Sequence, residues 1–175
     1  MSRIPGVTER DQVAEDKRHI WDEIIGSRGS VRGPFKVLMH SPELAGRIAH
    51  TGAYIRFESG LEAHVREMGA MITARVLDCN YEYGAHEGAA RALGTSEATL
   101  TAIRERKPDG LPDDVRWIYD LVEQLVDRHR ITPETFAIAQ EHLGVAGLVE
   151  LVGTIGYYAM IAAPLNAFEV EWNPA

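Results

Sequence analysis

The sequence predicts an all-α protein, a single-domain bundle of seven or eight helices. Apolar residues recur at helical spacing through long segments, and no segment shows the period-two alternation of a strand. Cap-then-proline signals and single glycines divide the chain into pieces of helix length. The 175 residues are enough for one continuous core, and 45% apolar with 25% charged residues is typical of a globular protein.

The N-terminal part of the chain is predicted to hold one helix and a loop. The helix is expected over residues 8–25, with Thr8 as its N-cap and Gly26 at its end. The glycine-rich residues 26–34 would follow as a loop. We therefore expect residues 1–33 to form an N-terminal helix and loop, and residues 34–175 to form the main helical domain, the two making one compact unit.

The middle of the chain carries clear helix boundaries. Ser41 and Pro42 suit the N-cap and the first helical position, and Gly94 suits the left-handed residue that ends a helix. On such signals and on the spacing of apolar residues, further helices are expected over 62–77 and 81–93, in a short segment after Thr95, from 113 or 114 to 129, and from 133 to about 143.

The last segment, 145–165, is apolar apart from Glu150 and a few weakly polar residues. Its length reaches the roughly 20 residues that span a bilayer. Glu150 lies inside the run, no basic cluster flanks it, and Pro164 interrupts its end. We therefore expect a helix buried in the core or in an oligomer interface, and no membrane partner.

Charge and cysteine content exclude several classes of protein. Eighteen Lys and Arg against 26 Asp and Glu give a net charge of −8, so nucleic acid is not an expected partner. A single cysteine excludes a disulfide framework or a two-thiol redox centre within one chain. The first ten residues lack the apolar region of a secretory signal, so a cytoplasmic location is expected.

The stretch 78–86 holds the clearest chemical pattern. On a helix, Cys79, Glu82 and His86 fall within an arc of about 60° on one face, and Glu82 can reach His86 directly. A carboxylate beside an imidazole is a proton-transfer pair whose ring titrates near neutrality. Tyr81 and Tyr83 flank the pair and can shield it from water. A Glu and a His four positions apart are also common on a solvated helix surface, and that alternative stays open.

Glu67 lies on the preceding predicted helix, among apolar residues. Most such carboxylates stand on the exposed edge of their helix. If Glu67 is buried without a cation, its pKa is raised and the neutral acid can donate a proton. The other histidines show no zinc-like spacing, and the two Glu-x-x-His motifs of a di-iron bundle are absent, so no metal is expected.

Glu67, Cys79, Glu82 and His86 follow one another at spacings of twelve, three and four residues. This spacing resembles the carboxymuconolactone decarboxylase and alkylhydroperoxidase D superfamily, whose peroxidase members carry Glu, Cys-x-x-Cys and His. Tyr81 to His86 is similar to the Tyr-Glu-Trp-x-x-His form of the decarboxylase-like branch. Further segments that resemble the family are 34–44, 66–72, 150–158 and 165–168. The resemblance implies the helical bundle of that family and a homo-oligomer, a trimer or hexamer.

The resemblance also implies a function. Because Glu82 replaces the second cysteine, acid–base chemistry is favoured over thiol chemistry. We expect a carboxy-lyase without a cofactor that acts on a small molecule, an unsaturated lactone or enolisable carboxylic acid. His86 would stabilise the enolate or return the proton, Glu82 would orient it, and Glu67 would serve as a second acid or as part of a proton relay. Cys79, Tyr83 and Arg75 are expected to bind the substrate, with Arg75 or Arg56 facing its carboxylate.

Two alternatives remain at this stage. Cys79 can support a peroxiredoxin-like alkylhydroperoxidase or other thiol redox activity if a resolving thiol comes from elsewhere. The chain can also be a non-catalytic, oligomeric binding protein that keeps the fold. Isomerisation or another enolate reaction would use the same groups as decarboxylation.

Overall fold

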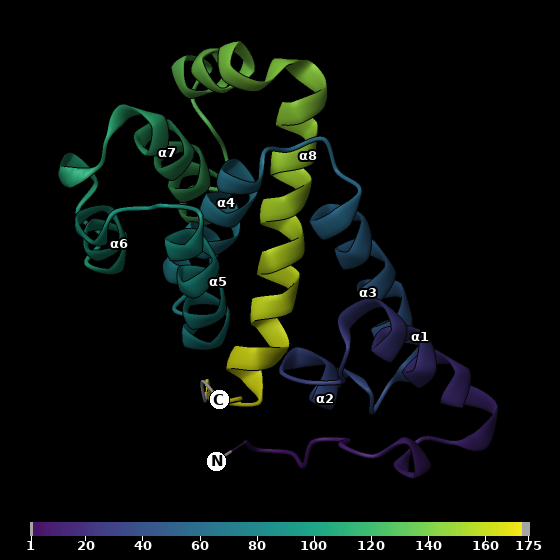
Figure 1. Ribbon diagram of the computed structural model, residues 1–175. Coiled ribbons are helices and arrows are strands. Elements are labelled where there is room, and N and C mark those ends of the chain that lie inside the picture. The colour runs from purple at the N-terminus through teal and green to yellow at the C-terminus, as the bar shows by residue number, and fades with distance from the viewer. Residues whose placement is uncertain (1, 173–175) are drawn as a thin grey trace.

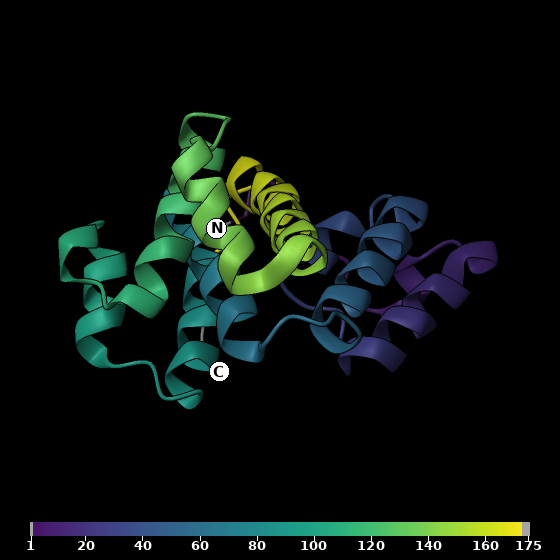
Figure 2. The ribbon, with the colours of Figure 1, turned by 90° about the horizontal axis from the view of Figure 1, so that it is seen from above.

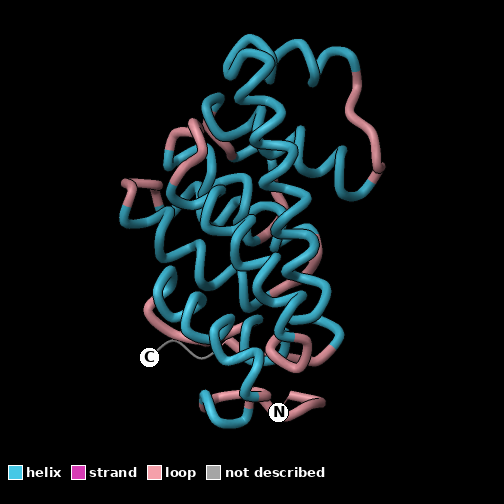
Figure 3. Tube along the Cα trace, turned by 90° about the vertical axis from the view of Figure 1, so that its right-hand side faces the viewer, coloured by secondary structure: helices cyan, strands magenta, loops and turns pink. Residues whose placement is uncertain are grey.

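Eight α-helices and three short 3₁₀ helices make up the computed structural model, which describes residues 2–172 and has no strand in that range (Figure 3). The predicted all-α class is confirmed. In chain order the α-helices are α1 (Arg18–Arg28), α2 (Pro34–Leu38), α3 (Pro42–Phe57), α4 (Ala63–Val76), α5 (Asn80–Ala92), α6 (Glu97–Arg104), α7 (Asp113–Asp127) and α8 (Pro133–Ala167).

Helix α8 runs through the middle of the molecule, with α1 to α3 on one side and α4 to α7 on the other (Figures 1 and 2). Helix α4 packs against α5, α7 and α8. Its residues from Met68 to Ala74 are all buried, so this helix forms the centre of the core. An apolar run on several faces is the pattern expected of a helix enclosed by other helices.

Several helix boundaries agree with the sequence signals. Helix α3 begins at Pro42 after Ser41, although the Ser41 hydroxyl forms no capping bond. Helix α5 ends before Gly94, whose φ of 92° places it in the left-handed region. Ser96 caps α6 by accepting a hydrogen bond from the amide of Thr99. The Gly94 and Ser96 signals therefore marked the end of α5 and the start of α6, while at Ser41 the position agreed without the capping bond.

The N-terminal helix differs from the prediction at both ends. Two 3₁₀ turns, Arg10–Gln12 and Glu15–Lys17, precede α1, which starts at Arg18 and not at Thr8. The Gln12 side chain accepts from the amides of Thr8 and Glu9 and closes a separate turn there. At the other end α1 continues past Gly26 to Arg28, because Gly29, with a φ of 74°, is the left-handed residue that ends it.

The helices expected over 133–143 and 145–165 form a single element, α8. It bends at Gly144, whose φ of 65° and ψ of 179° are not helical, and Pro164 lies in its last turns. By length and composition α8 is able to cross a membrane, and 44% of its most apolar window is buried. A core helix of a soluble protein meets the same criterion, so the absence of a membrane partner stays a prediction.

Candidate functional site

Helices α4 and α5 pack side by side and bring together the carboxylates and the imidazole that the sequence singled out. Asp78, with a φ of 51°, turns the chain between them, and Cys79 is the N-cap of α5. Glu67 comes from α4, while Glu82 and His86 lie one turn apart on α5. We call these three residues the Glu67–Glu82–His86 cluster.

A carboxylate faces each nitrogen of the His86 ring. The distance from Nδ1 to Oε2 of Glu67 is 2.6 Å, and that from Nε2 to Oε2 of Glu82 is 3.4 Å. Side-chain exposure is 12% for His86, 14% for Glu67 and 8% for Glu82. The cluster is thus largely closed to solvent. Glu67 does not stand on the exposed edge of its helix, and Glu82 and His86 are not a solvated surface pair.

The two carboxylates change the charge of the ring. Burial by itself lowers the pKa of His86, but hydrogen bonds to and charges on Glu67 and Glu82 outweigh it and raise the pKa to about 9. The sequence prediction of a ring that titrates near neutrality is therefore wrong, because it considered one carboxylate and not two. At pH 7 His86 is an imidazolium with both N–H groups directed at carboxylates.

Glu67 is ionised, not a neutral acid. Burial raises the pKa of Glu67, but the hydrogen bond and charge of His86, with the charges of Arg66 and Arg56, lower it below its ordinary value. Arg66 Nε lies 3.7 Å from Oε1 of Glu67. Glu67 is thus buried beside cations, which differs from the conditional case of burial without a cation, and it can only accept a proton in this state.

Tyr158, from α8, completes the wall beside the imidazole. Its ring stands edge-on to His86 with 4.6 Å between the ring centres. Burial and the charges of Glu82 and Glu67 raise the pKa of the Tyr158 phenol, so it stays protonated throughout the ordinary pH range. The sequence analysis missed Tyr158 as a site residue, because helical spacing relates positions on one helix and Tyr158 arrives from a distant one. It also missed Arg66, although Arg66 directly precedes Glu67 on α4.

Cys79 is a buried thiol at the start of α5. Its exposure is 1%, and it has no other cysteine to pair with. Burial raises the pKa of the thiol more than the amide hydrogen bonds from Glu82 and Tyr81 lower it. A protonated, inaccessible thiol is a weak nucleophile.

Two residues expected to bind substrate point elsewhere. The Tyr83 hydroxyl lies 3.3 Å from the carbonyl of Leu100 on α6 and 3.4 Å from Glu87 on α5. Arg75 donates to the carbonyl of Arg104 at 2.7 Å and pairs with Asp78. These contacts hold both side chains away from the cluster, so the structure supports neither as a substrate ligand. Arg56 is exposed, and its charge reaches Glu67 and Tyr158.

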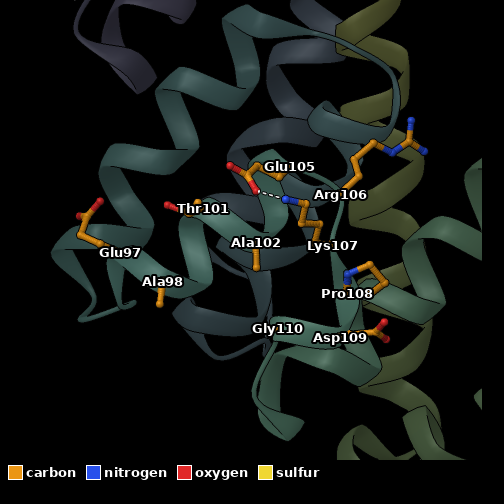
Figure 4. Close-up of a pocket in the computed structure, with 10 residues that line it drawn as sticks. All are labelled: Glu97, Ala98, Thr101, Ala102, Glu105, Arg106, Lys107, Pro108, Asp109 and Gly110. Carbon is orange, nitrogen blue, oxygen red and sulfur yellow. Dashed lines mark hydrogen bonds and ion pairs between the residues drawn. The ribbon is translucent and has the colours of Figure 1, made fainter.

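A hollow on the surface beside α6 is separate from the cluster. Residues of α6 and of the turn up to Gly110 line it, and Glu105 pairs with Lys107 there at 2.7 Å (Figure 4). None of the lining residues belongs to the cluster. Among residues 2–172, no group of three or more His, Cys, Asp or Glu side chains is placed to hold a metal ion.

Comparison with known proteins relates this site to a family. Residues 42–110, which include the whole cluster, match the model of the Carboxymuconolactone decarboxylase family. No curated protein sequence matches the chain.

Two solved structures have the same fold. One is described as an alkylhydroperoxidase AhpD core, an uncharacterized peroxidase-related protein from Ralstonia eutropha JMP134 (TM-score 0.80, 19% identity, 98% of this chain and 92% of that chain covered). The other is an uncharacterized peroxidase-related protein from Silicibacter sp. TM1040 (TM-score 0.76, 16% identity, 98% and 94% covered). The segment that carries Glu67, Glu82 and His86 therefore matches the model of the Carboxymuconolactone decarboxylase family, and the chain as a whole has a fold similar to that of an alkylhydroperoxidase AhpD core.

Proposed function

We propose that this protein is a cofactor-independent acid–base enzyme that decarboxylates an unsaturated lactone acid or a related enolisable carboxylic acid. The observation that carries the proposal is the His86 ring with a carboxylate at each nitrogen, at 2.6 Å and 3.4 Å. A protonated ring held in place by fixed carboxylates is a general acid already oriented for proton transfer.

The two contacts of the ring have different roles in this proposal. The short bond from Nδ1 keeps the ring oriented through Glu67. The longer contact from Nε2 to Glu82 is the weaker one, so a substrate atom can take its place. When carbon dioxide leaves, the electron pair of the broken C–C bond remains as an extended enolate. The imidazolium stabilises that negative charge and then delivers the Nε2 proton to carbon.

The proton balance follows from the charges in the cluster. One proton passes from His86 to the enolate, and the neutral imidazole takes one from solvent before the next turnover. The high pKa of His86, about 9, favours rapid reprotonation at pH 7. Glu67, ionised, holds the imidazolium and does not itself act as the acid. Positioned proton transfer of this kind contributes about 10²–10⁴-fold to a rate.

Thiol peroxidase activity is the second candidate, because the two structures of similar fold are described as peroxidase-related proteins. Against it stand the lack of a second cysteine in this chain and the burial of Cys79. A peroxide would oxidise the thiol to a sulfenic acid, which then needs an external thiol for its reduction. Cys79→Ser separates the candidates: an acid–base enzyme keeps most of its turnover, and a peroxidase loses all of it.

The test is carbon dioxide release from γ-carboxymuconolactone by the purified protein. We expect turnover by the wild type, a drop of about 10²-fold or more in His86→Gln, and no change in Glu87→Gln, a matched variant one position further along α5. Circular dichroism confirms that both variants fold. Equal turnover in His86→Gln and wild type would remove His86 from the chemistry, and no turnover in the wild type would exclude this lactone as a substrate.

A homo-oligomer, a trimer or hexamer, stays a prediction. Val145, Val149, Val152 and Met160 form an exposed apolar line along α8 at the spacing of one helix face, which suits burial against another copy. Light scattering after size-exclusion chromatography measures the copy number, and a monomer would contradict the prediction. The cytoplasmic location likewise stays a prediction.

A further inference from the structure

Arg28, the last residue of α1, directs a positive charge into the interior. Its guanidinium lies over the ring of Phe35, 4.4 Å from the ring centre, and Nη2 donates to the carbonyl of Ala49 at 3.1 Å. The Nε atom is closed to solvent and has no hydrogen-bond partner. Over residues 2–172, Arg28 forms no ion pair with a carboxylate.

A second donor without a partner lies beside it. Tyr157, on α8, is 4% exposed, and its hydroxyl is also buried without a hydrogen-bond partner. Gly52 of α3 makes the approach possible, because a β carbon there would overlap the Tyr157 hydroxyl and stand 2.5 Å from Nη2 of Arg28. The two polar groups are therefore neighbours, packed over the same glycine.

A buried guanidinium N–H and a buried phenol O–H that each lack an acceptor are an unfavourable arrangement, since each has given up its hydrogen bonds to water. Burial raises the pKa of the Tyr157 phenol, and its oxygen can accept from the Arg28 guanidinium, which by itself lowers that pKa. The phenol O–H and the Arg28 Nε–H are still donors without an acceptor, and the guanidinium carries a full positive charge. A carboxylate offers two acceptor oxygens and the compensating negative charge, and its pairing with arginine is among the strong hydrogen-bonded contacts in proteins. The missing partner therefore has the chemistry of a carboxylate.

The pair is adjacent to the Glu67–Glu82–His86 cluster. The Tyr157 ring packs edge-on against Tyr158 with 5.2 Å between centres, and Tyr158 packs against His86 at 4.6 Å. The charges of both Arg28 and Glu82 act on the Tyr157 hydroxyl. Arg28 and Tyr157 also lie outside the family-matched residues 42–110. A ligand bound to Arg28 and Tyr157 would extend toward His86 and would contact residues both inside and outside the family-matched segment.

We propose that Arg28 and Tyr157 form a subsite that binds the carboxylate of a small organic acid and presents the rest of that molecule to His86. The proposal rests on the proposed function for the identity of the reacting site, and it adds the group that recognises the substrate. Because Nε and the phenol oxygen are closed to solvent, entry requires local movement of the side chains that cover them.

The experiment measures binding without turnover. Isothermal titration calorimetry measures the affinity of the protein for cis,cis-muconate, with the neutral dimethyl ester of muconate as the control ligand. Nuclear magnetic resonance follows the Nε–Hε signal of Arg28 in the same titrations. We expect muconate to bind the wild type and shift that signal, and the ester to do neither. Arg28→Gln should weaken binding by more than about tenfold and Tyr157→Phe by about three- to tenfold. Arg32→Gln, an exposed arginine of the same loop, should bind as the wild type does.

Tyr157→Phe keeps the test decisive if Arg28→Gln fails to fold, because it removes one oxygen and leaves the ring and its packing in place. Three results would each overturn the subsite. The wild type does not bind muconate, or Arg28→Gln and Tyr157→Phe bind it as tightly as the wild type does, or the Arg28 signal reports only a buried water. The carbon dioxide assay tests the proposed reaction, and its outcome does not depend on the result of the binding experiment. Muconate binding that depends on Arg28, without turnover of any lactone, would support the subsite and refute the reaction.

Discussion

Helix α5 carries two glutamates on different faces, and the basic partners of the two differ in their exposure to solvent. Glu82, 8% exposed, faces His86, which is itself 12% exposed. Glu87, 18% exposed, pairs with Arg104 and Arg91, whose side chains are 48% and 45% exposed. Water screens the arginines of the second group but not the imidazole of the first. The comparison shows that, although burial by itself lowers the pKa of His86, the two carboxylates raise it, because little water reaches the cluster to screen these contacts.

The largest expected effect on stability is at His86. His86→Gln leaves two buried carboxylates without their cation, so we expect the free energy of unfolding at pH 7 to fall by about 3 kcal/mol. Urea denaturation of the wild type and the variant measures the difference. A loss below about 1 kcal/mol would place the cluster with ordinary surface pairs.

His86 and Glu67 should make the free energy of unfolding depend on pH, each in its own pH range. The pKa of His86 rises from 6.5 to about 9 on folding, so its contribution is complete below pH 6.5 and is lost as the pH rises through 9. The full change corresponds to about 3 kcal/mol. The pKa of Glu67 is lowered on folding. Glu67 therefore stabilises the folded protein when the pH is above the ordinary pKa of a glutamate, and this stabilisation is lost as the pH falls through its folded pKa.

Urea unfolding at pH 6, 8 and 10 follows this change for the wild type and for His86→Gln. The gap between the two proteins should narrow toward pH 10, and a constant gap would refute the assignment of the titration to His86.

The two carboxylates of the cluster should not be equivalent. The hydrogen bond to Glu67 is the largest influence that raises the pKa of His86, followed by that to Glu82. We therefore expect Glu67→Gln to lower the pKa of His86 by more than Glu82→Gln does, each by about one pH unit or more. Titration of both variants by nuclear magnetic resonance gives the order, and the reverse order would contradict the geometry.

The smallest effect is expected on the exposed side of α5. Glu87→Gln should change the free energy of unfolding by less than about 1 kcal/mol, since its arginine partners are half exposed. Urea unfolding at low and high salt measures this change, which added salt should reduce further. A loss as large as that of His86→Gln would remove the contrast between the two faces.

The sequence predicted the parts of this site that one helix determines. Positions 82 and 86 are one turn apart on any α-helix, so their pairing followed from spacing alone. Whether Glu67 was buried, and beside which cation, depended on how α4 packs on α5, and periodicity contains no such information. The pKa of His86 was misjudged for the same reason.

The residues contributed by other helices were harder to identify. Tyr158 and Tyr157 come from α8, and Arg28 comes from α1, whose start at Arg18 was itself mispredicted. A lone arginine before a glycine looks like an ordinary helix end. Only the tertiary structure shows that the Nε atom of Arg28 is buried without a partner.

The most direct test of the central claim is the pKa of His86 in the intact protein. Nitrogen-15 nuclear magnetic resonance of the ring, assigned with His86→Gln, follows its protonation from pH 5 to pH 11 while the other six histidines serve as internal references. We expect a midpoint near 9 and an imidazolium with both nitrogens protonated at pH 7. A midpoint at or below 6.5 would mean that the two carboxylates do not hold a charged ring, and the proposed general acid would be lost with it.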